Sequence, residues 1–444
     1  MTRTRQHNHP IPGPNCAAAL IFAVGLFLAI SPTALAQTTA YTAGNASFSE
    51  GQAISGRPQA AYSLLHNFTG GRDGGTPYAA LTAQAGNLYG TTYAGGSVGL
   101  GAVFETSPNG SGGWTTAVLH NFRGAPDGAN PYAGLVMDSA GNLYGTTHAG
   151  GNSSTDCYGG CGTVFEISPN GSGGWTTTVI HNFTGRNGER PYAGLVLDGA
   201  GNLYGTAYAG GSYGLGVVFE LSPNGHGGWT STILHNFGND DDGQYPKAGL
   251  VFDAAGNLYG TTTGGGSLHS GVVFAMTPNG NGWTETVIHN FGQGNDGFIP
   301  QTGSLILDAS GNLYGTCSLG GSHMAGTAFE MSPNGSGGWT EKVIHNFGSG
   351  SDGTDPYAGL IFDASGNLYG ATTGGGGVND GTVFMMTPNG SGGWTESVLH
   401  NFGQGLDGIS PAGAGLVFDS SGNLYGATSG GGSHDYGTVF ELTP

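Results

Sequence analysis

Short apolar runs separated by polar turns recur along the chain after about residue 60, and the stretch 356–402 shows one complete unit. Each run has the length and the β-branched or aromatic content of a strand, and none has the 3.6-residue period of a helix. Turn residues join the first two runs, which predicts a hairpin, and glycine-rich segments separate the others. The four expected strands are Gly359–Asp363, Asn367–Thr372, Thr382–Met386 and Trp394–Phe402.

This unit is repeated seven times. The motif Gly-Asn-Leu-Tyr-Gly begins at Gly86, Gly141, Gly201, Gly256, Gly311, Gly366 and Gly422. The motif His-Asn-Phe begins at His66, His120, His181, His235, His289, His345 and His400. Successive copies of the first motif are 55 to 60 residues apart, and each of the six Trp precedes a His-Asn-Phe. Four antiparallel strands in a repeat of this length indicate the blade of a β-propeller.

The two ends of the repeat region complement each other. The first copy begins with an outer strand alone, at residues 62–68, and the last copy ends after its third strand, at Leu442. The N-terminal strand can therefore complete the last blade and close a ring, whereas an open solenoid would need polar end caps instead. We predict an all-β, seven-bladed β-propeller over residues 62–444, closed by the N-terminal strand.

Composition agrees with an all-β repeat protein. Glycine accounts for 92 of 444 residues and only 8% are charged, which excludes a helical bundle, while 37% hydrophobic residues are too many for a disordered chain. Packed blades with tight connections need glycine for positive φ angles and close backbone approach. The net charge of −19 argues against binding to nucleic acid or to anionic lipid, because both require a basic surface.

The N-terminus has the pattern of a secretory signal. Arg3 and Arg5 precede an apolar run of about 15 residues, and Ala34-Leu35-Ala36 fits a signal-peptidase site. That run is short for a membrane span, which needs about 20 residues, and a retained anchor is the alternative. We expect a signal peptide at 1–36, a linker at 37–61, and a monomer secreted to the periplasm or extracellular space of a Gram-negative bacterium, without a membrane span after cleavage.

Three cysteines remain after the expected cleavage. Cys157 and Cys161 lie four residues apart in a glycine-rich insertion, and an oxidising compartment would let them form a disulfide. Two cysteines without a paired histidine do not make a zinc site. Cys317 stands where the other copies have Thr or Ala, which predicts a buried free thiol.

The repeat resembles the GloVer (Gloeobacter/Verrucomicrobia-type) tandem repeat of bacterial exported proteins. The resemblance rests on Gly-Asn-Leu-Tyr-Gly-Thr-Thr, a Gly-Gly-Gly loop, Gly-Thr-Val-Phe and Pro-Asn-Gly-Ser-Gly-Gly-Trp-Thr, and it covers about residues 62–444. It implies a bacterial exported, propeller-like protein and brings no catalytic residues. Members often end in a sorting segment, and the sequence ends instead in strand-like residues, which weakens the expectation of surface attachment.

Residues that recur in every copy are expected to be structural. We expect the His-Asn-Phe histidines to hydrogen-bond a neighbouring strand, the Trp rings to pack between outer strands, and the Asp before each hairpin turn, such as Asp138, to cap that turn. The loops between blades contain Asp-Gly, an ordinary turn dipeptide that also makes Ca²⁺ a candidate, although Ca²⁺ takes six to eight oxygen ligands. The loop residues are Asp73, Asp127, Asp242, Asp296, Asp352 and Asp407, with Asn187 in the third copy. No other cofactor is expected.

Positions that differ between copies are better candidates for a ligand site. The loops between blades and the loops between second and third strands share one face of a propeller, and both vary here. A circle of aromatic side chains around a channel mouth would stack on sugars or hold a peptide. The alternative is that these tyrosines fill gaps between blades. The predicted ligand-binding residues are Tyr78, Tyr132, Tyr192, Lys247, Gln301, Tyr357, His323 and His434.

The sequence therefore favours a non-catalytic secreted protein that binds a glycan or another exported protein. The alternative is a metal-dependent lyase or hydrolase acting on a polysaccharide or lactone, with His269, His323 and His434 as metal ligands from neighbouring blades. No cluster of carboxylates and histidines is local enough in the sequence to name a catalytic site.

Overall fold

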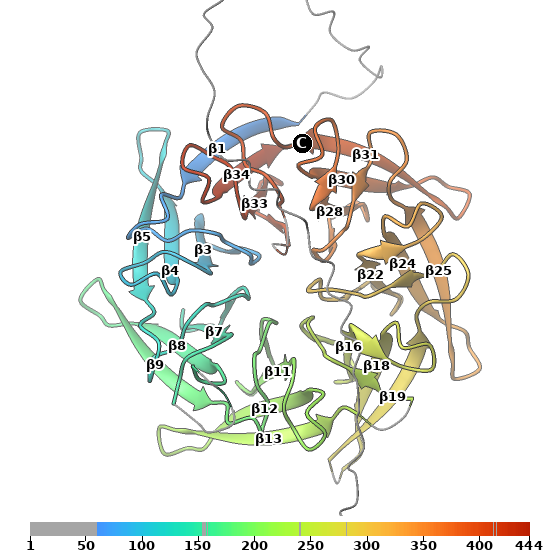
Figure 1. Ribbon diagram of the computed structural model, residues 1–444, viewed down its shortest axis with the longest axis horizontal. Helices are drawn as coiled ribbons and strands as arrows, with labels where there is room; N and C mark the ends of the chain where they lie inside the picture. The colour runs from blue at the N-terminus through green and yellow to red at the C-terminus, as the bar shows by residue number, and fades with distance from the viewer. Residues whose placement is uncertain are drawn as a thin grey trace, which may run out of the picture. The chain divides into compact units, whose positions relative to one another are not determined.

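The computed structural model describes residues 60–152, 157, 159–238, 241–280, 282–411, 413 and 415–444. The expected signal peptide and almost all of the linker lie outside this range. The described chain forms seven four-stranded antiparallel sheets, arranged as blades in a ring (Figure 1). The predicted seven-bladed β-propeller is confirmed. No helix among the described residues is long and apolar enough to cross a membrane.

Each blade has an inner, a second, a third and an outer strand. The inner strands are β2 (Thr82–Gln84), β6 (Val136–Met137), β10 (Val196–Leu197), β15 (Val251–Phe252), β21 (Ile306–Leu307), β27 (Ile361–Phe362) and β32 (Val417–Phe418). The second strands are β3 (Asn87–Thr92), β7 (Leu143–Thr147), β11 (Leu203–Ala207), β16 (Leu258–Thr262), β22 (Leu313–Cys317), β28 (Leu368–Thr372) and β33 (Leu424–Thr428).

The third and outer strands are longer. The third strands are β4 (Ala102–Pro108), β8 (Thr163–Pro169), β12 (Val217–Pro223), β18 (Val272–Pro278), β24 (Thr327–Pro333), β30 (Thr382–Pro388) and β34 (Thr438–Thr443). The outer strands are β5 (Trp114–Asn121), β9 (Trp175–Asn182), β13 (Trp229–Asn236), β19 (Trp283–Asn290), β25 (Trp339–Asn346), β31 (Trp394–Asn401) and β1 (Ala61–Asn67). Three small ladders join loops beside the blades: β14 (Gly243–Gln244) with β17 (Gly264–Gly265), β20 (Gly297–Phe298) with β23 (Leu319–Gly320), and β26 (Gly353–Thr354) with β29 (Gly374–Gly375).

The N-terminal strand closes the ring as predicted. β1 pairs antiparallel with β34, from Ala61 opposite Thr443 to Asn67 opposite Thr438 (Figure 1). The pair contains a register shift before His66, and the third and outer strands of the other blades have a shift at the equivalent place, as between Val103 and Phe104. The first strand therefore has the geometry of a true fourth strand.

Phenylalanine pairs join each blade to the next. The Phe of His-Asn-Phe in one blade packs on the third-strand Phe of the following blade, with ring centroids 5.0–5.2 Å apart and ring planes inclined by 60–72°. The pairs are Phe68–Phe104, Phe122–Phe165, Phe183–Phe219, Phe237–Phe274, Phe291–Phe329, Phe347–Phe384 and Phe402–Phe440. All are buried, and each contact is worth about 0.5–1.5 kcal/mol beyond the buried area. Because Phe68 follows the closing strand, this series of contacts is continuous around the ring.

The hairpin caps are confirmed, and the Trp prediction is corrected. The Asp138 carboxylate accepts hydrogen bonds from the backbone N–H groups of Ala140 and Asn142, each 2.9 Å long. Each Trp begins an outer strand, but its ring packs on the second-strand Tyr of the preceding blade, as Trp175 does on Tyr89, with centroids 6.1 Å apart. The Trp crosses to the middle of the neighbouring blade because the blades meet face to face.

Candidate functional site

The inner ends of the blades surround a cavity of about 290 Å³ in the central channel. Its wall is formed mainly by small residues that lead into the inner strands, and Tyr132 and Tyr192 are also part of it. The fifth and seventh copies each contain one extra residue before the inner strand, and these insertions place Thr302 and Gly413 in the cavity wall. The cavity wall therefore departs from the sevenfold symmetry of the repeats.

Four of the predicted tyrosines converge at the mouth of this cavity. Tyr78 stacks on Tyr132 with centroids 4.7 Å apart, and Tyr132 meets Tyr192 edge-on at 5.1 Å. Tyr357, from a blade much later in the chain, hydrogen-bonds to Tyr132. Burial, together with the neighbouring tyrosines, raises the pKa of Tyr132, so its hydroxyl stays protonated at neutral pH.

Lys247 and Gln301 extend the same cluster. The Lys247 Nζ lies 5.4 Å from the ring centroid of Tyr192 and 5.6 Å from that of Tyr208, within the range of cation–π attraction. It also donates to the Gln301 Oε1 over 3.3 Å. Burial lowers the pKa of Lys247. Six of the eight predicted ligand residues thus form one connected group.

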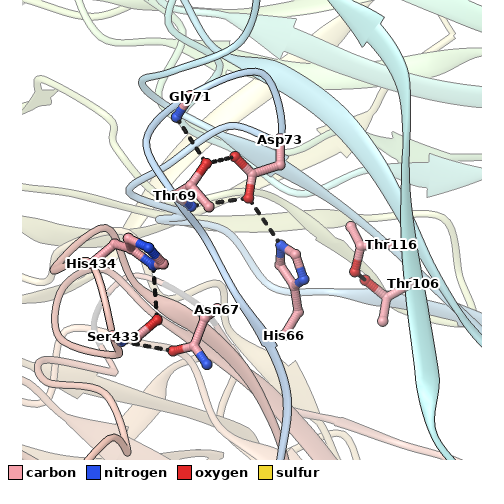
Figure 2. Close-up of polar contacts among 9 residues, drawn as sticks. All are labelled: His66, Asn67, Thr69, Gly71, Asp73, Thr106, Thr116, Ser433 and His434. Atoms are coloured by element: carbon pink, nitrogen blue, oxygen red, sulfur yellow. Dashed lines mark hydrogen bonds and ion pairs between the residues drawn. The ribbon is translucent and has the colours of Figure 1, made fainter.

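The other two predicted residues lie apart from this group. His323 and His434 are exposed on loops between second and third strands, and each ring Nδ1 pairs with the preceding serine hydroxyl, at 3.1 and 2.8 Å. Figure 2 shows His434 with Ser433. Among the described residues, no compact group of three metal-ligating side chains contains either of them or His269. The structure therefore does not bring the three histidines together as metal ligands.

A second variable ring, which the sequence analysis missed, surrounds the mouth. The residue before each blade-to-blade proline has φ between 51° and 60°, in the left-handed region that side chains disfavour. Its N–H donates to a loop carbonyl over 2.7–3.0 Å, and its carbonyl accepts from the residue after a second strand over 3.1–3.4 Å. The seven residues are all different: Thr76, Asn130, Arg190, Tyr245, Ile299, Asp355 and Ser410. The sequence does contain a signal for this second ring: seven different residue types precede a proline that is present in every copy.

One side of the mouth is cationic. Arg190 is exposed, and its charge acts on Tyr192 and Tyr208. Burial, helped by Arg190, lowers the pKa of His148 to about 4, so this imidazole stays neutral beside Tyr192, 4.6 Å between ring centroids. Arg190 and Lys247 are two of only nine basic residues in the chain. The mouth therefore offers positive charge on an otherwise acidic protein.

The repeated motif residues, in contrast, have structural partners. In the first copy, the Phe packs between blades, Asn67 Oδ1 accepts the Ser433 N–H over 2.9 Å, and His66 Nε2 lies 3.3 Å from Asp73 (Figure 2). The prediction that this histidine hydrogen-bonds a neighbouring strand is wrong. In six copies its Nε2 faces the Asp seven residues later, in the loop to the next blade, at 2.9–3.3 Å. The Asp-Gly carboxylates are already occupied in this way, and Ca²⁺ at these loops stays a prediction.

The cysteines are also placed structurally. Cys157 and Cys161 are joined by a disulfide with their Cα atoms 5.2 Å apart. Cys317 is a free thiol, fully buried, and burial raises its pKa well above the usual value. A thiol in that environment is protonated and inaccessible, which fits a core residue and not a nucleophile.

Comparison with known proteins gives a family and a fold. The profile of the Gloeobacter/Verrucomicrobia repeat matches residues 38–156, 153–338 and 284–444. No curated protein is significantly similar in sequence. Among solved structures, a candidate 6-phosphogluconolactonase from Bacteroides uniformis is 17% identical, with a TM-score of 0.50 over 77% of this chain and 88% of that chain. At this identity the likeness concerns the fold alone.

Proposed function

The chain belongs to the Gloeobacter/Verrucomicrobia repeat family, and from this premise we propose that it is an exported, non-catalytic binding module that holds a saccharide at the mouth of its central channel. The observation that carries the proposal is the connected group of tyrosines with Lys247 and Gln301 above the cavity. The repeated residues are already used to hold the blades together. The residues at the channel mouth, in contrast, differ from copy to copy.

The chemistry of the mouth suits a sugar. Tyrosine offers a flat apolar face and a hydroxyl, which matches the alternating C–H and O–H surfaces of a pyranose ring. The rings of Tyr78, Tyr132 and Tyr192 are half-buried, so they are rigid yet remain within reach of solvent. Rigid aromatic side chains lose little conformational entropy on binding.

The charge of the mouth favours an acidic sugar. The protein as a whole carries −19, which would repel a polyanion, yet Arg190 and Lys247 lie on the same side of the tyrosine group. A uronate carboxylate placed there would gain a charge-assisted hydrogen bond, which is about twice as strong as a neutral one. We therefore propose uronate-containing polysaccharides as the ligand class.

The experiment is a depletion assay of the purified protein on insoluble polygalacturonate and alginate, with xylan as the neutral comparison, and soluble sugar products are measured in the same tubes. We expect depletion on the uronates without products. Tyr132→Ala combined with Tyr192→Ala should weaken binding at least tenfold, about 1.4 kcal/mol. Tyr213→Ala is the matched control, because Tyr213 is 52% exposed and outside the tyrosine group.

Two results would overturn the proposal. Equal binding by the double variant and the wild type, with unchanged thermal transitions, would exclude the mouth. Release of soluble products, or hydrolysis of a sugar lactone suppressed by a chelator, would favour the enzymatic alternative of a metal-dependent lyase or hydrolase. Lys247→Gln separates the charge argument from the stacking argument, because it should reduce binding to uronates and leave any binding to xylan unchanged.

A further inference from the structure

The seams between outer strands contain a cluster that the proposed function does not use. His235 and Asp242 of one blade face Glu285 on β19 of the next blade, and the ligand atoms of the three side chains all lie within 4.8 Å of one another. The His235 Nε2 is 3.0 Å from the Asp242 Oδ2. The same arrangement recurs two seams further along with His345, Asp352 and Glu396, and there the His–Asp distance is 2.9 Å.

These clusters are short of positive charge. Asp242 and Asp352 are each only 8% exposed, and Glu285 Oε1 and Glu396 Oε1 are buried without a hydrogen-bond partner. A buried Asp carboxylate beside a partly buried Glu carboxylate is unfavourable unless a cation or a proton lies between them.

The seam also has space for an ion with water. His235, Asp242 and Glu285 line a cavity of about 340 Å³ together with Asp241, Val287 and Asn290. A nitrogen and an oxygen 3.0 Å apart match two adjacent ligands of one metal, since metal–ligand bonds of about 2.0–2.2 Å then enclose an angle near a right angle. The ion would replace the proton that His235 Nε2 now shares with Asp242.

We propose that these two seams are binding sites for a divalent transition-metal ion of the Zn²⁺ or Mn²⁺ class, ligated by one imidazole and two carboxylates from adjacent blades. The imidazole favours these ions over Ca²⁺ and Mg²⁺, which prefer oxygen alone. Three protein ligands leave the remaining coordination positions to water in the cavity. Each ion would connect an outer strand and its following loop to the outer strand of the next blade.

The chain carries its own comparison sites. Four residues before the His of His-Asn-Phe, a glutamate stands only at Glu285, Glu341 and Glu396, and the other copies have Tyr62, Thr116, Thr177 and Ser231. Figure 2 shows the seam between β1 and β5, where Thr116 occupies the glutamate position and its hydroxyl bonds to Thr106 over 2.9 Å. Only seams with a glutamate supply a second carboxylate. Glu341 faces His289 and Asp296, but that group is not among the compact ones.

The test is titration of the purified, tag-free and oxidised protein with ZnCl₂ and MnCl₂, and with CaCl₂ as the comparison, followed by calorimetry and elemental analysis. We expect at least two equivalents of tightly bound Zn²⁺ and a Tm that rises with Zn²⁺ concentration, because the ion binds the folded state. Glu285→Gln and Glu396→Gln should each remove one equivalent, and the double variant should lose the Zn²⁺-dependent rise in Tm.

The outcomes are decisive in both directions. Absence of Zn²⁺ and Mn²⁺ binding at micromolar concentration, or stoichiometry unchanged by both substitutions, would overturn the sites and leave a shared proton as the explanation of the paired carboxylates. Stronger binding of Ca²⁺ than of Zn²⁺ would overturn the ion class. Thr116→Glu adds a carboxylate beside His66 and Asp73, and an additional equivalent in this variant would support the role of the glutamate position directly.

Discussion

The seam between the second and third blades provides a sharp test of how the His–Asp pairs act, because Asn187 stands there in place of the Asp. The Asn187 Oδ1 accepts the Thr184 N–H over 2.8 Å and the Thr184 hydroxyl over 3.0 Å. Its Nδ2 therefore points to His181 Nε2, 3.2 Å away, and this nitrogen must accept. His181 is thus held as the neutral tautomer with its proton on Nδ1.

The consequence is a pH dependence of stability. Burial lowers the pKa of His181 from 6.5 to about 4, so the unfolded state binds the proton more tightly than the folded state does. The contribution of His181 is therefore complete above pH 6.5 and is lost as the pH falls from 6.5 toward 4. At pH 5 these two pKa values correspond to a loss of about 2 kcal/mol relative to pH 7.

Asn187→Asp should remove most of this loss. The new carboxylate would accept a hydrogen bond from a protonated His181, so the folded state would keep the proton at pH 5. We expect the free energy of unfolding, measured by urea titration at pH 7 and pH 5, to fall by about 2 kcal/mol less in the variant than in the wild type. Asp127→Asn is the reciprocal control, since it should create the same sensitivity at His120.

Two observations would refute this reasoning. Equal losses of free energy between pH 7 and pH 5 in the wild type and in Asn187→Asp would show that His181 does not couple to folding. An NMR titration that gives His181 a pKa at or above 6.5 would show that the amide of Asn187 does not hold it neutral. Other buried histidines contribute equally to both proteins and cancel in the comparison.

Further predictions concern packing. A Cβ at Gly90 would lie 2.5 Å from Phe104 Cζ, so Gly90→Ala should destabilise by about 1–3 kcal/mol in urea titration, and an unchanged midpoint would contradict the tight packing. Gly199 has nothing within 4 Å of an added Cβ, so Gly199→Ala should instead stabilise the protein by about 0.4–1 kcal/mol. A lower free energy of unfolding in this variant would contradict the open space at Gly199. Phe68→Ala should cost about 3–5 kcal/mol and expose the N-terminal strand to proteolysis; a protein equally resistant to protease would argue against closure by β1.

The sequence was enough to predict the fold because each signal is repeated. Seven copies of the same strand pattern, with a lone outer strand at the start and a missing outer strand at the end, leave one arrangement, which is a closed ring. The boundaries were less accurate at the centre, where a five-residue run such as Gly359–Asp363 becomes the two-residue strand β27. There the chain runs along the channel wall before it enters the hairpin, and only Ile361 and Phe362 pair with β28.

The contacts of the site were harder to predict, because they depend on register between blades. Glu285 and His235 are 50 residues apart, and nothing near either one in the sequence indicates that they meet. The same holds for Tyr357 and Tyr132, which are separated by several blades along the chain and yet form a hydrogen bond. The Asp partner of each histidine is hard to predict for a local reason, because the Asp-Gly dipeptide seven residues later is also an ordinary turn sequence.

The residues before the blade-to-blade prolines connect fold and function. The chain uses glycine at most positions of positive φ, and glycine would fit these seven without strain, yet none of the seven is glycine. Asn and Asp tolerate the left-handed region, but each of the other five side chains costs about 1–2 kcal/mol there, which is a substantial burden for a protein of marginal stability. The two backbone hydrogen bonds at each position fix the backbone identically in every copy, while the side chain is different every time. A ring that keeps seven different side chains in the left-handed conformation around one channel mouth, five of them at a cost, is better explained by what those side chains contact than by how the blades pack.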